Sequence, residues 1–139
     1  MQRWIVGLVI LLALGACAAP QGTRLDPHAV TTMRAPWPPA IATAPHVPPR
    51  ILAVWMNETA VAPGTQWLGR IATTTNTASV EVRTESFSFN ATRIAFGQFV
   101  FSQHVLDVVP YYKRGYTLSI IARNADGVED TDLIPITMR

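Results

Sequence analysis

The stretch Tyr116-Thr117-Leu118-Ser119-Ile120-Ile121-Ala122-Arg123-Asn124-Ala125-Asp126-Gly127 decides the predicted fold. Tyr116, Leu118, Ile120 and Ala122 occupy every second position. Successive side chains of a strand point to opposite faces, so this alternation predicts a strand with one buried face. Asn124 and Gly127 are turn residues, and Ile134, Ile136 and Met138 alternate after them. The stretch therefore predicts a closing β-hairpin, with the last strand around Ile134 to Met138.

The residues before this hairpin show similar patterns. Short apolar runs separated by turn residues are typical of β structure. We expect strands at Ile51–Met56 and Gln66–Thr73, with a turn at Pro63-Gly64 between them. Two alternating stretches predict further half-buried strands, one with Val80, Val82 and Thr84 facing inward and one with Phe99 and Phe101. We therefore expect an all-β domain of about seven strands over residues 50–139.

The pattern Tyr-x-Leu-x-Ile-x-Ala-x-Asn-x-x-Gly from Tyr116 to Gly127 resembles the penultimate strand of immunoglobulin-like and fibronectin-type-III-like domains. The resemblance implies an antiparallel β-sandwich. It also implies that Tyr116 is the tyrosine corner, whose hydroxyl group bonds to the backbone at the edge of the sandwich. The cysteine pair of antibody domains is absent, and Trp55 or Trp67 corresponds only loosely to the core tryptophan. Another sandwich or a small barrel is the alternative.

The beginning of the chain has the layout of a secretory signal. Arg3 precedes an apolar run from Trp4 to Leu14, and small residues follow it. The run is too short for a comfortable membrane-spanning helix, which needs about 20 residues. Leu14-Gly15-Ala16-Cys17 resembles the lipobox of bacterial lipoproteins, which implies cleavage before Cys17 and acylation of that residue. We therefore expect a lipoprotein signal peptide, as a helix, at residues 1–16, with an ordinary signal peptide or an uncleaved short anchor as the alternatives.

Residues 17–49 form a compositional break. Eight of the eleven prolines lie here, and proline prevents a regular helix or a central strand. We expect a lipidated cysteine followed by a disordered, partly polyproline-like tether up to Pro49. Ala35-Pro36-Trp37-Pro38-Pro39 could be a docking peptide, and His28 and His46 could bind a metal, but a plain spacer is favoured for both.

Charge and motifs argue against several classes of function. Without Arg3 the side chains sum to about +1, which is not the basic balance of a nucleic-acid-binding domain. Ser102, His104 and Asp107 are near one another in sequence, but no nucleophile elbow or phosphate-binding glycine loop accompanies them. The acidic residues Asp126, Glu129, Asp130 and Asp132 lack calcium-loop spacing and predict a solvated turn. We expect no enzyme activity, cofactor or metal.

One segment is a candidate binding site. Tyr111, Tyr112, Lys113 and Arg114 bunch aromatic and basic side chains, which are enriched at interface hot spots. The segment precedes the Tyr116 strand and should lie at one end of the sandwich. The alternative is that one tyrosine packs beneath the loop and the charged residues are simply solvated.

Together these features predict a non-enzymatic envelope lipoprotein whose immunoglobulin-like domain acts as a structural or protein-binding accessory. Its expected partners are a membrane, reached through the lipid on Cys17, and an envelope protein or cell-wall component. The lipobox resemblance and Ala18 favour the outer membrane, if the cell has one. A glycan-binding module is the alternative, and a hydrolase is a more distant one.

Overall fold

The computed structural model describes residues 33–107 and 112–139. The signal segment, Cys17 and Tyr111 lie outside these residues. Within them the regular secondary structure is β, and no helix is long and apolar enough to cross a membrane. The strands in chain order are β1 (Ile51–Met56), β2 (Ala60–Val61), β3 (Gln66–Thr73), β4 (Thr77–Arg83), β5 (Ser88–Asn90), β6 (Thr92–Ala95), β7 (Gln98–His104), β8 (Gly115–Asn124) and β9 (Glu129–Met138).

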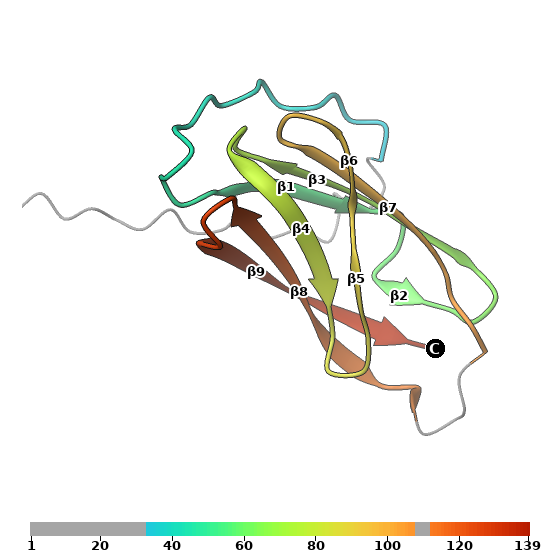
Figure 1. Cartoon of the computed structure of the whole chain (residues 1–139). Coiled ribbons are helices and arrows are strands. Elements are labelled where there is room, and N and C mark those ends of the chain that lie inside the picture. The colour runs from blue at the N-terminus through green and yellow to red at the C-terminus, as the bar shows by residue number, and fades with distance from the viewer. Residues whose placement is uncertain (1–32, 108–111) are drawn as a thin grey trace, which may run out of the picture.

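The strands form two sheets that pack as a sandwich (Figure 1). One sheet has the order β1-β3-β7-β6 and the other has the order β2-β9-β8-β4-β5. All pairs are antiparallel except β2 with β9, which is parallel and short. If β1, β3, β4, β6, β7, β8 and β9 are lettered A to G, the sheets read ABED and CFG, which is the immunoglobulin order. The predicted all-β sandwich is confirmed, with nine strands in place of about seven.

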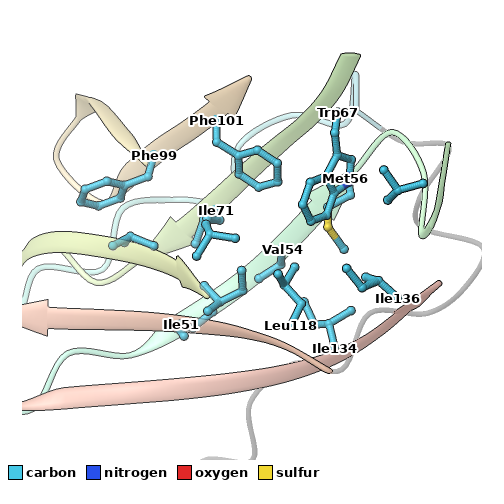
Figure 2. Packing of buried hydrophobic residues seen from close by; sticks show 14 of the residues in the cluster. Ile51, Val54, Met56, Trp67, Ile71, Phe99, Phe101, Leu118, Ile134 and Ile136 are labelled. Carbon is cyan, nitrogen blue, oxygen red and sulfur yellow. The ribbon is translucent and has the colours of Figure 1, made fainter. Parts of the chain in front are cut away.

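The core lies between the sheets and comes from the inward positions that the alternation predicted. Tyr116, Leu118, Ile120 and Ala122 of β8 are all buried, as are Val80 and Val82 of β4. Figure 2 shows the cluster, with Trp67 and Met56 at one end and Phe99 toward the other. Because apolar burial drives folding, this cluster holds the domain together without a disulfide.

One glycine shapes the aromatic part of the core. Gly69 of β3 pairs with Phe101 of β7, and a Cβ atom added to Gly69 would lie 2.0 Å from Cε1 of the Phe101 ring. The ring packs edge-on against Trp67, with ring centroids 5.2 Å apart, and against Phe89, with centroids 5.4 Å apart. The missing side chain of Gly69 therefore makes the space that this aromatic cluster fills.

The expected tyrosine corner is present. The Tyr116 hydroxyl group donates a hydrogen bond of 2.8 Å to the carbonyl oxygen of Tyr112. Tyr116 lies near the start of β8, directly after the connection from β7, where the resemblance placed it.

The structure differs from the expected tether in residues 33–49, which lie against the domain. Figure 1 shows this segment, in cyan and teal, running along the upper rim of the sandwich before it enters β1. Nη1 of Arg70 donates to the carbonyl oxygens of Met33 and Ala35, at 2.6 Å each. The Arg70 guanidinium lies 4.2 Å from the Trp37 ring centroid, and Trp37 meets Trp55 edge-on at 5.8 Å.

We call residues 33–49 the strap. Its later part is also bonded to the domain. The Asn76 side chain donates to the carbonyl oxygens of Ala44 and Val47, and Asn124 donates to those of Pro45 and Val47. Pro49 is buried. Proline removes a backbone donor but leaves carbonyl acceptors, so a proline-rich segment can dock without joining a sheet. Residues 33–49 are therefore packed against the domain instead of forming the disordered tether expected there.

Candidate functional site

The predicted binding segment forms one corner of the sandwich. Of its four residues, Tyr111 lies outside the described part of the chain. Tyr112 is 42% exposed and Lys113 is exposed. The carbonyl oxygen of Tyr112 is fixed by the Tyr116 hydroxyl group, so the backbone of this corner is anchored while the side chains face solvent.

Arg114 is held more firmly than the sequence suggested. Its Nη2 atom donates to Oε1 of Glu85, and its guanidinium lies 4.5 Å from the centroid of the Tyr116 ring. The two ion-pair side chains stay about half exposed, so solvent weakens the pair. The corner therefore presents Tyr112 and Arg114 to solvent together, with Arg114 positioned by Glu85 and Tyr116.

A second exposed feature was missed by the sequence analysis. All four residues of β6 are exposed, including Ile94 at 54%, and Phe96 in the turn to β7 is 71% exposed. Arg93 lies over the Phe96 ring, 5.5 Å from its centroid. Gly97, with φ +72°, closes this turn, and its carbonyl oxygen accepts a hydrogen bond from the Thr73 amide at 2.8 Å. The alternation of Ile94 and Phe96 is visible in the sequence, but it does not show whether these side chains face the core or solvent.

β6 is also the last strand of its sheet. Among the described residues it pairs with β7 alone, with a register shift between Arg93 and Ala95. An edge strand carries backbone donors and acceptors that another extended chain can use. We call β6 with Phe96 the β6 edge. It combines exposed apolar side chains with one open side of a sheet.

The residues that suggested hydrolysis do not form a catalytic arrangement. The Ser102 Oγ atom accepts a hydrogen bond of 2.6 Å from the Gln66 amide, across the β3–β7 pair. A serine nucleophile instead needs a base that accepts its proton. Within the described ranges, no group of three or more metal-binding side chains comes together. Nδ1 of His46, in the strap, lies 2.6 Å from Oδ2 of Asp126.

The predicted acidic turn is wrong for Glu129, Asp130 and Asp132, which lie in β9, although Glu129 is exposed. Oδ2 of Asp130 accepts a hydrogen bond of 2.7 Å from the amide of Ile51, and Asp132 is 6% exposed. β9 begins at Glu129, because its pairing with β8 extends back to Arg123. Asp130 and Asp132 are therefore part of the packed sandwich rather than of a solvated loop.

A carboxylate on the outer face of the five-stranded sheet is firmly paired. Glu81 accepts hydrogen bonds from Arg83 and from Nη1 of Arg123, the latter at 2.8 Å, and its side chain is 13% exposed. The hydrogen bond from Arg123 is the main cause that lowers the pKa of Glu81 below its ordinary value, against the opposing effect of burial. We interpret this group as structural, because it lies in the middle of a sheet.

No protein-family model matches this chain, and no curated protein matches it. Arguments about its function therefore rest on its own residues.

Proposed function

We propose that this chain is a non-enzymatic, lipid-anchored protein of the cell envelope whose immunoglobulin-like domain binds a protein partner. The anchor is Cys17, on the strength of its lipobox resemblance. The observation that carries the binding step is the β6 edge, where Ile94 and Phe96 are exposed beside an open sheet margin.

The chemistry of this edge favours an extended polypeptide as the partner. A strand added to a sheet edge gains main-chain hydrogen bonds, and pockets or apolar side chains supply selectivity. Exposed Ile94 and Phe96 would lose water on contact, which contributes roughly 25 cal/mol per Å² of apolar surface. A glycan offers no matching row of backbone donors and acceptors.

Site-specific photo-crosslinking in the native host tests this proposal. A photoreactive phenylalanine analogue replaces Phe96 in one strain. In a control strain it replaces Leu133, which is 56% exposed but lies on β9 in the other sheet. We expect a discrete crosslinked protein band from position 96 and none from position 133. Equal crosslinking at both positions, or none at 96, would contradict the proposed binding surface.

The anchor is tested separately by labelling cells with a fatty acid that carries a clickable group. The wild-type chain should take up the label and sediment with membranes. The Cys17→Ala chain should take up none, because its only thiol is gone. An unlabelled wild-type chain would remove the lipid anchor from the proposal and leave the β6 edge untouched.

A glycan-binding module is the second candidate, supported by the corner at Tyr112 and Arg114. Tyrosine offers a flat amphipathic surface, and arginine forms paired hydrogen bonds. Sedimentation of the chain with purified cell-wall material distinguishes the two. Loss of sedimentation in Tyr112→Ala, with no change in Phe96→Ala, would favour the glycan.

A further inference from the structure

One end of the sandwich contains an apolar cavity that the proposed function does not use. Its volume is about 270 Å³. Its base is formed by Val61 of β2 and Trp67 of β3, which are 1% and 2% exposed. Trp67 marks this end of the core in Figure 2. The cavity therefore reaches the hydrophobic core rather than resting on the surface.

Aromatic rings line the way from solvent to this base. Phe87 and Phe89 stack with ring centroids 6.2 Å apart and planes 8° apart. Phe89 then contacts Phe101, which contacts Trp67. Phe87 is 37% exposed and Leu106 is 73% exposed, so apolar side chains continue to the mouth. Such exposure of large apolar residues costs free energy unless something covers them.

The polarity of the lining restricts the ligand. Among the described residues, no aspartate, glutamate, lysine or arginine lines the cavity, and its polar members are Ser88, Gln103 and His104, all exposed. Burying a charge without a partner is strongly unfavourable, so a charged group cannot enter this cavity. A hydroxyl or carboxyl group could stay at the mouth, within reach of the three polar side chains. The lining therefore fits an apolar chain with at most one polar end.

Size restricts the ligand further. An engineered apolar cavity of about 150 Å³ holds one benzene molecule, so 270 Å³ holds about ten carbon atoms. We propose that this cavity binds one unbranched alkyl chain of about ten carbons, with its polar end at the mouth. The proposal does not depend on the lipid anchor or on the β6 edge.

Trp67 provides a direct readout, because bromine quenches tryptophan fluorescence only on contact. The test uses the full chain with Cys17→Ala, refolded from urea without detergent, so that no attached or added acyl chain competes. The ligand is decanoic acid brominated on its terminal carbon. We expect saturable quenching that disappears in Trp67→Phe. If Trp67→Phe does not fold, shifts of the Val61 and Val105 methyl resonances on titration with decanoic acid replace this comparison.

Matched variants separate cavity binding from general adhesion to apolar surface. Leu106→Glu places a carboxylate at the mouth of the cavity. Leu133→Glu makes the same change at a less exposed leucine on β9, which does not line the cavity. Because the carboxylate would have to lose water against the chain, Leu106→Glu should weaken binding by about tenfold or more. Leu133→Glu should leave binding unchanged.

Two sources of alkyl chain are distinguished by changing the carrier. Quenching by vesicles of phosphatidylcholine with brominated acyl chains would identify membrane lipid as the source. Quenching by brominated decanoic acid alone would identify a free amphiphile, and either result supports the proposal. Absence of saturable quenching and of methyl shifts, or equal effects of Leu106→Glu and Leu133→Glu, would overturn it.

Discussion

The hydroxyl group of Tyr116 bonds to the carbonyl oxygen of Tyr112, four residues earlier, at 2.8 Å. The bond joins the start of strand β8 to the connection that leads into it. The Tyr116 ring is buried at 9% exposure, and it carries the Arg114 guanidinium on its face. One side chain thus connects the core to the candidate binding corner.

Tyr116→Phe should lower the free energy of unfolding by about 1 kcal/mol, because it removes this hydrogen bond and leaves the ring in place. Urea unfolding followed by circular dichroism measures the change. Lys113→Ala, at an exposed position in the same corner, is the control and should change stability by less than about 0.5 kcal/mol. Equal stability of Tyr116→Phe and wild type would show that the corner bond contributes nothing.

Gly69→Ala should destabilise the domain by about 1–3 kcal/mol, the usual effect of overpacking a core. The new Cβ atom would overlap the Phe101 ring, which Trp67 and Phe89 hold on two sides. Thermal unfolding of Gly69→Ala, Phe101→Leu and the double variant forms a cycle. We expect the double variant to be more stable than the sum of the two losses predicts, because the smaller side chain relieves the overlap. Simple additivity would contradict the proposed clash.

Glu81 should make folding stability dependent on pH. Its pKa is lower in the folded protein than the ordinary 4.5, so the ionised group stabilises the fold above that pH. The stabilisation is lost as pH falls from 4.5 through the folded pKa. The difference in unfolding free energy between wild type and Glu81→Gln should therefore be largest near about pH 7 and shrink toward about pH 3. Glu85→Gln, which removes an exposed ion pair, should have nearly the same unfolding free energy as wild type at either pH.

Arg70→Met should release the first part of the strap. Arg70 binds the carbonyl oxygens on both sides of Arg34, and Arg34 is exposed. Trypsin cleaves after arginine once the backbone opens, so cleavage after Arg34 should speed up by about tenfold, equivalent to about 1.4 kcal/mol of lost docking. Arg93→Met, which removes an arginine from another aromatic ring, is the control. A cleavage rate unaffected by Arg70→Met would show that these bonds do not hold the strap.

The sandwich itself was predictable because strand patterns are local. Alternation alone placed Val80, Val82 and Leu118 inward, and the bounds of β1 and β3 match the expected strands. β2 was missed because two residues between turns carry no alternation. Proline is usually confined to edge strands, yet Pro135 lies in β9, which has neighbours on both sides. β2 pairs only with Thr137 and Met138, so Pro135 needs no donor on that side.

The strap and the exposed sites depend on contacts between distant parts of the sequence. The carbonyl oxygen of Ala35 finds its donor 35 residues later in Arg70, and no local pattern announces that pairing. Ile94 and Phe96 alternate as inward residues would, but they lie at the sheet margin, where no second sheet covers them. The cavity at Trp67 likewise requires five strands to meet, namely β2, β3, β5, β7 and β9.

Under the proposed lipid anchor at Cys17, the docked strap also shortens the distance that the domain can reach from a membrane. Residues 33–49 lie against the sandwich, so they do not add to the length of chain between the anchor and the domain. At about 3.1 Å per residue, a fully extended segment of that length would add about 50 Å of reach. A shorter reach raises the effective concentration that neighbours on the same membrane experience. Arg70 and Trp37, which hold the strap, would therefore affect the encounter frequency of a surface that neither residue belongs to.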